Sequence, residues 1–294
     1  MKKLFFVMNP YAGVRKASKQ LADILAVFNR AGFDVIVYIT QSQGDAQEVV
    51  RNRAKEMDLI VCSGGDGTFN ETVSGVLESG ADVPIGYIPS GSTNDFANSL
   101  GLAADPVEAA KNIANGKPER FDVGSFNGRH FTYVASFGVF TKTSYATPQN
   151  VKNALGHTAY VLGGIQELSQ LKNTYHLKME LDGEMVEGDF VFGAVCNSTS
   201  VGGIITLDAD RVDMQDGLFE ILLIRYPKDL TEVAECIQAL QNKTYNSKML
   251  TFRSARNISI VADPNMAWTL DGEKELGSAQ IKVENLHRAF TLVR

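Results

Sequence analysis

The chain has 294 residues, enough for two ordinary domains or one large one. Hydrophobic residues make up 44% and charged residues 21%, a balance that allows a globular protein to bury a core. The net charge of −6 argues against a basic surface that binds nucleic acid. The apolar run at 4–8 is far shorter than the roughly 20 residues of a membrane span, and the three cysteines form no CxxC pair. We therefore expect a cytosolic protein without disulfides or zinc.

Residues 1–124 alternate short apolar runs with segments of helical periodicity. The apolar runs predict strands at 4–8, 35–39, 59–63 and 84–89. The periodic segments predict helices at 16–32, 46–57 and 68–77. Alternation of strands and helices predicts an α/β domain with a parallel sheet covered on both faces. Ligands of such sheets bind at the carboxyl ends of the strands.

From residue 126 onward the pattern changes, because Asn127-Gly128 and Asp182-Gly183 are hairpin signals between strand-like runs. Strand-like runs include 130–138 and 176–195, and later ones are 218–224, 258–261, 281–283 and 290–293. Two helices are expected among them, near 151–171 and 230–241. We predict a second, mainly antiparallel β-domain at 125–294, whose last strand can return to the first domain. The active site is expected in the cleft between the domains.

The segment "CSGGDGTFNET" at 62–72 places Asp66 inside a glycine-rich turn between a predicted strand and a predicted helix. A P-loop needs GxxxxGK[ST], which is absent, and Asn70 stands where a dinucleotide fingerprint needs its third glycine. One interpretation is a tight turn with a solvated aspartate. The other is a phosphate site at the helix N-terminus, with Mg²⁺ bridging the phosphate and Asp66. The flanking strand and helix favour the second interpretation.

Three segments together resemble the diacylglycerol kinase catalytic domain: "NPYAG" (9–13), "GGDGTFNE" (64–71) and "IPSGSTNDFA" (88–97). The resemblance covers nearly the whole chain and is strongest to the soluble bacterial diacylglycerol kinases, which phosphorylate a lipid hydroxyl with ATP and Mg²⁺. GGDGT alone is shared with NAD kinases and phosphofructokinases, so the resemblance implies an N-terminal domain like theirs. The pair GGDGTxNE and GSTNDFA is the specific signal.

The resemblance implies a nucleotide pocket at the ends of the predicted strands. Its residues would be Asn9, Gly13, Thr40, Gly65, Asp66, Gly67, Glu71, Ser92 and Asp95. Ser92 stands where the family has threonine, and the hydroxyl is kept. Asp95 opens a predicted helix, so a cap or first-turn acid is the alternative role. Asp122 in "RFDVG" matches a further acid of the family, with a catalytic role.

The tripeptide DGE occurs twice, at 182–184 and 271–273. The family has its DGE near the C-terminus after an aromatic or apolar strand, which selects the second copy. By this resemblance Glu273 is the general base that takes the proton of the lipid hydroxyl. Asp271 is then an electrostatic or metal-network partner. The first copy is expected to be an ordinary hairpin turn.

The segment "ADRVDMQDGLFE" at 209–220 resembles a family motif that holds a structural Mg²⁺. Asp216 would bind the ion through its side chain, and Asp213 and Leu218 mainly through backbone oxygen. The segment departs from the family, which has proline where this chain has Asp210 and an acid where it has Gln215. A polar hairpin turn is the alternative, since Asp-Gly is itself a turn signal.

The sequence therefore predicts an ATP-dependent lipid kinase that converts diacylglycerol to phosphatidic acid with Mg²⁺. The alternatives are a kinase of another lipid alcohol, an NAD kinase, or a nucleotide- or lipid-binding sensor without turnover. A lipid substrate requires peripheral contact with the membrane, for which Arg15, Lys16 and Lys19 are candidates; a solvated helix face is the alternative. The resemblance also suggests a homodimer.

Overall fold

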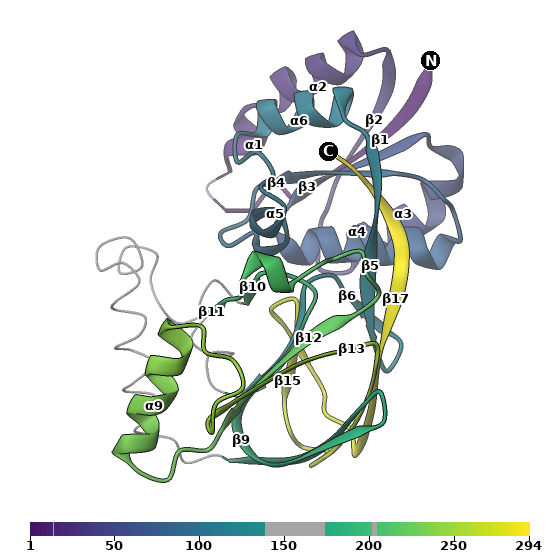
Figure 1. The fold of residues 1–294 in the computed structure, drawn as a ribbon. Helices are drawn as coiled ribbons and strands as arrows, with labels where there is room; N and C mark the ends of the chain where they lie inside the picture. Colours follow the sequence, from purple (N-terminus) through teal and green to yellow (C-terminus); the bar gives the residue numbers. More distant parts are fainter. Residues whose placement is uncertain (14, 139–173, 202–204) are drawn as a thin grey trace. The chain divides into compact units, whose positions relative to one another are not determined.

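The computed structural model describes residues 1–13, 15–138, 174–201 and 205–294, so the helix predicted near 151–171 lies outside the described residues. The chain forms two compact units, Met1–Val123 with Leu286–Arg294, and Gly124–Asn285. Two strands, β5 (Pro118–Phe126) and β17 (Gln280–Val293), begin in one unit and end in the other (Figure 1). Within the described part of the chain, no helix has both the length and the apolarity to cross a membrane.

The first unit contains a parallel sheet in the order β4-β3-β1-β2. The end of β17 adds a further parallel strand beside β4, with Leu292 opposite Ile85. The strands are β1 (Lys2–Met8), β2 (Phe33–Ile39), β3 (Leu59–Gly64) and β4 (Ile85–Pro89). The helices are α1 (Lys16–Lys19), α2 (Leu21–Arg30), α3 (Asp45–Arg53), α4 (Asp66–Ser79), α5 (Asp95–Ser99) and α6 (Pro106–Asn115), with a 3-10 turn η1 (Ala54–Glu56).

Helices α2 and α6 cover one face of this sheet, and α3 and α4 cover the other (Figure 1). Strand β1 is central, and its residues 4–8 are at most 1% exposed. Leu4 and Phe6 pack with Ile24 and Phe28 of α2 on one face. A strand buried on both faces gives a continuous apolar run, which is why the sequence predicted it correctly. The predicted α/β domain with a parallel sheet is confirmed.

A cluster of aromatic rings fixes the positions of α4 and α5 against the sheet. Phe69 of α4 stacks on Tyr87 of β4 with 4.3 Å between ring centroids. Phe96 of α5 lies 4.6 Å from the same Phe69 ring. Contacts of this kind hold the two helices, which both begin directly after sheet strands, in a defined relation to each other.

The second unit is built mainly from antiparallel strands, as the sequence predicted. Its strands follow the order β16-β15-β7-β9-β8-β14, while β12 pairs with both β9 and β13, and β14 also pairs with β17. The strands are β6 (Arg129–Phe131), β7 (Val134–Gly138), β8 (Tyr175–Leu181), β9 (Glu184–Cys196), β10 (Ser200–Val201), β11 (Ile205–Thr206), β12 (Phe219–Arg225), β13 (Leu250–Ala255), β14 (Asn257–Ala262), β15 (Trp268–Leu270) and β16 (Glu273–Glu275). One helix, α9 (Leu230–Gln241), and a 3-10 turn, η2 (Ala209–Arg211), accompany them.

Several elements differ from the sequence prediction. The helix predicted at 16–32 is divided at Gln20 into α1 and α2. The strands predicted at 281–283 and 290–293 are parts of the single strand β17, in which Arg288 has a left-handed backbone with φ of 51°. That irregularity interrupts the alternation of apolar and polar residues and hides the continuity of the strand. Helix α6 was not predicted, although Asp105 caps it and Pro106 opens it.

Candidate active site

The loops after β1, β3 and β4 meet at the carboxyl end of the parallel sheet. Asn9, directly after β1, donates through Nδ2 to Thr68 Oγ1 in the first turn of α4, at 3.3 Å. After β4, the backbone N–H of Ser90 donates to the carbonyl of Gly64, at 2.7 Å. The predicted nucleotide segments at 9–13, 64–71 and 88–97 are thus brought together within the first unit.

Glycines are required where these loops touch. A Cβ added to Gly91 would lie 2.6 Å from the Cα of Gly65. Gly13 has a φ of +50°, and an added Cβ there would collide with the carbonyl oxygen of Ser90. Because the backbones are this close, no side chain fits between them, and only glycine allows the loops to approach in this way. We call residues 9–13, 64–67 and 90–94 the glycine cradle.

Asp66 and Asp95 begin the two helices that start at the cradle, α4 and α5. The Oδ1 atom of Asp66 accepts a hydrogen bond from the backbone N–H of Phe96, at 3.3 Å. This bond places the first turn of α4 beside the first turn of α5. Asp95 is 1% exposed, and Gly67 follows Asp66 in the first turn of α4. Two carboxylates and the N–H groups of the 14-residue helix α4 therefore lie at one end of the sheet.

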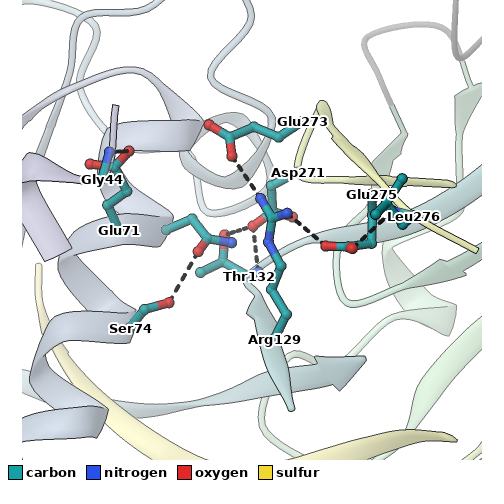
Figure 2. A network of polar contacts seen from close by, with 10 residues as sticks. Gly44, Glu71, Ser74, Arg129, Thr132, Asp271, Glu273, Glu275 and Leu276 are labelled. Atoms are coloured by element: carbon teal, nitrogen blue, oxygen red, sulfur yellow. Dashed lines mark hydrogen bonds and ion pairs between the residues drawn. The ribbon is translucent and has the colours of Figure 1, made fainter. Parts of the chain in front are cut away.

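Three other predicted nucleotide residues have varied surroundings. Thr40 is buried, and its hydroxyl donates to the carbonyl of Met8 at 3.3 Å, which ties β2 to β1. Glu71 accepts hydrogen bonds from the backbone N–H groups of Gly44 at 2.7 Å and Ala46 at 3.3 Å (Figure 2). Its carboxylate thereby caps α3, so Glu71 has a structural task. Ser92 is exposed in the loop between β4 and α5.

Asp122 is fully buried in the part of β5 that belongs to the first unit. Its Oδ1 atom accepts a hydrogen bond from the backbone N–H of Arg288, at 2.7 Å. Arg288 is the left-handed residue of β17, so the carboxylate stabilises the irregular point of that strand. The structure thus gives Asp122 a definite packing role within the first unit.

The two DGE tripeptides form the same turn. In each, Asp has a φ near 48° and Gly a φ near 90°: 47° and 95° at 182–183, and 49° and 85° at 271–272. These left-handed pairs make two-residue hairpins, in which Leu181 faces Glu184 and Leu270 faces Glu273. The backbone geometry therefore does not separate the two copies. Their surroundings do.

Asp271 is 5% exposed, and its carboxylate is held by the segment after β6. It accepts hydrogen bonds from the N–H groups of Tyr133 and Val134, both at 3.0 Å, and from the N–H and hydroxyl of Thr132. Figure 2 shows the carboxylate against Thr132. The four bonds fix the turn before Glu273, which makes Asp271 a residue that positions the base predicted at 273.

The matching Asp182 makes a similar clamp at the surface. Its carboxylate accepts hydrogen bonds from the N–H groups of Arg256 at 2.8 Å and Asn257 at 3.0 Å. These bonds lower the pKa of Asp182, with the Arg256 N–H as the largest cause. The clamp by aspartate is therefore a property of both turns, and the environment of the glutamate is what differs.

Glu273 lies beside a side chain that the sequence did not single out. Its Oε2 atom is 2.8 Å from Nη2 of Arg129, whose Nη1 atom is 2.6 Å from Oε2 of Glu275 (Figure 2). Arg129 is 144 positions away from Glu273 in the chain. Only the pairing of distant strands brings them together, so no local signal could have found this arginine.

The acidic segment predicted to hold a metal contains two Asx turns. Asp213 accepts from the N–H of Gln215 and Asp216 from the N–H of Leu218, both at 2.9 Å. The carbonyl of Leu218 accepts from Asn285 Nδ2 at 3.0 Å. These bonds fit the alternative of a polar turn, and they leave further lone pairs on the same oxygens.

A neighbouring residue, Glu220, bears on whether a cation fits there. It is 2% exposed, and its Oε2 atom accepts no hydrogen bond from the described residues. Burial raises its pKa to about 8, and the charges of Asp216 and Asp213 add to the effect. A cation would offset this concentration of acids. The described residues contain no group of three or more metal-binding side chains, so such a site would depend on backbone oxygens.

The chain thus combines a parallel α/β unit that carries a glycine cradle with an antiparallel β unit that carries a clamped acidic turn. Residues 3–126 match the family model described as "Diacylglycerol kinase catalytic domain". Residues 132–294 match the model described as "YegS C-terminal NAD kinase beta sandwich-like domain".

Curated relatives agree over nearly the whole length. A diacylglycerol kinase of Bacillus subtilis is 32% identical, covering 93% of this chain and 90% of its own. One from Staphylococcus saprophyticus is 30% identical, covering 92% and 89%. A crystal structure of a diacylglycerol kinase from Bacillus anthracis has a TM-score of 0.77 and 25% identity, covering 99% and 96%. Another structure from that organism has a TM-score of 0.82 at 27% identity. The chain belongs to the diacylglycerol kinase family.

Proposed function

We propose that this protein transfers the γ-phosphoryl group of ATP to the hydroxyl of diacylglycerol and releases phosphatidic acid and ADP. Residues 1–124 would bind the nucleotide, and residues 125–294 the lipid. The observation that carries the proposal is the glycine cradle, where an added Cβ on Gly91 would lie 2.6 Å from Gly65. Such backbone-lined space at the N-terminus of a helix suits phosphate. The names of the relatives support the lipid acceptor.

Mg²⁺ would lie with the phosphates, where it neutralises negative charge during transfer. Asp66 is the residue we assign to hold it, because a carboxylate inside an anion site otherwise opposes binding. Asp95, at the start of the neighbouring helix, would join this metal network, and the buried Asp122 would have the catalytic role that the resemblance implies. Asn9, Gly13, Thr40, Gly65, Gly67, Glu71 and Ser92 would complete the nucleotide pocket.

Glu273 would act as the general base. The lipid hydroxyl oxygen forms a bond to the γ-phosphorus, the bond from that phosphorus to the bridging oxygen of ADP breaks, and the hydroxyl proton goes to Glu273. Asp271 supports this step by fixing the turn through its four hydrogen bonds to 132–134. A second Mg²⁺ at Asp213, Asp216 and Leu218 would be structural.

Diacylglycerol remains in the bilayer, so the enzyme would work as a cytoplasmic protein that docks on the inner face of the membrane. The exposed Arg15 and Lys19 would contribute to docking. Lys16 contributes less, because it is paired with Asp105 at 2.9 Å. The family resemblance supports a homodimer as the assembly.

The proposal is tested with radiolabelled ATP and Mg²⁺ against a panel of acceptors. Mixed micelles carry diacylglycerol or another lipid alcohol, and a parallel reaction contains NAD. We expect label in phosphatidic acid, and loss of transfer when EDTA removes Mg²⁺. Label in phosphorylated NAD would establish the NAD kinase alternative. Binding of ATP or lipid without any transfer would establish a sensor.

A further inference from the structure

Glu273 lies on a strand that the sheet holds weakly. Strand β16 has three residues and ends the strand order, with β15 as its neighbour among the described strands. A general base has to be kept in one orientation toward the proton it takes. A short edge strand leaves a glutamate with three rotatable bonds too free for this purpose. Another group must therefore fix the side chain.

Arg129 is placed to do so. Glu273 and Glu275 are two residues apart on β16, so their side chains lie on the same face of the strand. The guanidinium of Arg129 bridges them, with Nη2 at 2.8 Å from Glu273 Oε2 and Nη1 at 2.6 Å from Glu275 Oε2 (Figure 2). The other oxygen of Glu275 accepts the N–H of Leu276 at 2.9 Å. Glu275 is thus a fixed second anchor for the guanidinium.

The backbone at Arg129 is held in place by the hairpin turn that precedes it. It opens β6 after the Asn127-Gly128 turn and faces Phe126 across the hairpin. Asn127 ties this turn to β17 by donating its N–H to the Lys282 carbonyl, at 2.9 Å, and by accepting the Lys282 N–H at 2.8 Å. A few residues later, the segment 132–134 holds Asp271. One stretch of chain therefore holds both acids of the DGE turn.

The magnitudes indicate that this ion pair serves orientation more than folding. The side chain of Arg129 is 44% exposed and that of Glu273 is 29% exposed. Ion pairs at such exposure contribute about 0–1 kcal/mol to stability. The guanidinium is a rigid, permanently charged fork, so it can fix the direction of two carboxylates at once. It engages one oxygen of Glu273, and the other accepts no hydrogen bond from the described residues.

We propose that Arg129 is a positioning residue for phosphoryl transfer. Braced by Glu275, it holds the Glu273 carboxylate in one orientation and directs its second oxygen toward the substrate hydroxyl. The inference rests on the proposed function, because it assigns Arg129 a task that acts through the general base. It adds a side-chain network, Arg129–Glu273–Glu275, to the second DGE turn. In the first DGE turn the matching glutamate, Glu184, is exposed at the start of β9.

A double-mutant cycle in the labelled-ATP assay tests the proposal. Arg129→Gln should lower kcat about 10- to 100-fold with little change in the KM for ATP, because orientation is lost while the nucleotide site is untouched. In a Glu273→Gln background, Arg129→Gln should cost no further activity. Arg129→Lys should recover part of the loss.

A matched control, Arg120→Gln, removes another ion pair between an exposed arginine and a carboxylate. The guanidinium of Arg120 donates to both carboxylate oxygens of Asp82 at 2.9 Å. Neither Arg120 nor Asp82 is among the residues assigned to the active site. Arg120→Gln should leave kcat within about twofold of wild type, as expected for an exposed pair. All variants are compared in the same thermal unfolding assay. If Arg129→Gln fails to fold, Glu275→Gln replaces it, because removal of the second anchor should lower kcat through the same route.

The positioning role, the general base and the proposed function would each be refuted by a different result. A wild-type kcat in Arg129→Gln would refute a positioning role. Losses that multiply in the double mutant would show that Arg129 acts independently of Glu273, which also overturns the inference. Wild-type turnover in Glu273→Gln would instead remove the general base on which the inference rests. Transfer of label to NAD or no transfer by the wild-type protein would refute the proposed function itself.

Discussion

At the scale of single residues, the acids of the family motifs differ in what their carboxylates contact. Asp271 uses its carboxylate on four hydrogen bonds to 132–134, and Glu71 uses its own on the N-terminus of α3. Asp66 lies instead in the glycine cradle at the start of α4. Family motifs group these acids together, whereas their contacts show that they perform different physical tasks.

Asp66→Ala should abolish turnover and leave the fold intact. The variant loses the hydrogen bond that Asp66 accepts from the N–H of Phe96 at 3.3 Å, and a bond of this kind is a small part of the stability of the unit. It also loses the carboxylate assigned to Mg²⁺, so kcat should fall by about 10³-fold or more, as when a group that stabilises transferred phosphate is removed. Activity is measured across a Mg²⁺ titration. A folded variant with near wild-type turnover at ordinary Mg²⁺ concentrations would refute this assignment.

At the scale of elements, the two Asp-Gly turns are one structural device used twice. In both, the aspartate adopts a left-handed backbone and binds N–H groups of a neighbouring segment. The device requires only a two-residue hairpin and a strand beside it. A sequence motif of three letters therefore identifies the turn, while the catalytic assignment depends on what surrounds the glutamate.

The turn at 182 gives a prediction for stability against pH. The pKa of Asp182 is lowered in the folded state, chiefly by the Arg256 N–H, so its stabilising effect is present above the unfolded pKa. That effect is lost as pH falls through the lowered folded pKa. Asp182→Asn should cost about 1 kcal/mol or less at pH 7, because the site is exposed to solvent.

The difference between wild type and Asp182→Asn should shrink below a pH of about 4, where the unfolded aspartate becomes protonated. Chemical denaturation at pH 7, 5 and 3 measures it. An equal difference at every pH would show that the carboxylate charge contributes nothing to the clamp.

At the scale of the whole molecule, the sequence predicted the fold class because the first unit has strong local signals. Strand β1 is buried on both faces, and α4 follows a glycine-rich turn. Strands β15 and β16 have three residues each and were missed. Periodicity needs a longer segment to be visible, and such short strands exist because of their neighbours.

The meeting of the cradle segments was predictable because each follows a strand of the parallel sheet, whereas contacts made through the pairing of distant strands were not. The motifs at 9–13, 64–71 and 88–97 follow β1, β3 and β4, which are neighbouring strands of a parallel sheet, so the fold class implies that they meet. Arg129 and Glu275 meet across 146 positions through pairing of distant strands. Burial raises the pKa of Glu220. The sequence shows a glutamate in a predicted strand but does not show that its side chain is buried.

The proposed docking on the membrane would depend on the whole surface and gives a further prediction. Changing Arg15, Lys16 and Lys19 to Gln should weaken binding to anionic vesicles, more at low salt than at high salt. Arg15 and Lys19 should account for most of the effect, because Lys16 is paired with Asp105. Vesicle sedimentation at several salt concentrations measures it. Unchanged binding would assign these residues to an ordinary solvated surface.

The most direct test of the catalytic assignment compares Glu273→Gln with Glu184→Gln. Both glutamates follow the same Asp-Gly turn and face a leucine, so an effect of the turn itself should be common to both variants. Each change keeps the size of the side chain and removes its proton affinity. Steady-state transfer of labelled phosphate to diacylglycerol is measured after thermal unfolding shows both variants folded.

Glu273→Gln should lower turnover by about 10²- to 10⁴-fold, the usual contribution of a positioned acid–base group, with modest change in nucleotide binding. Glu184→Gln should remain close to wild type. Loss of activity in Glu184→Gln with retention in Glu273→Gln would contradict the placement of the active site. Retention in both would show that transfer needs neither glutamate as a base.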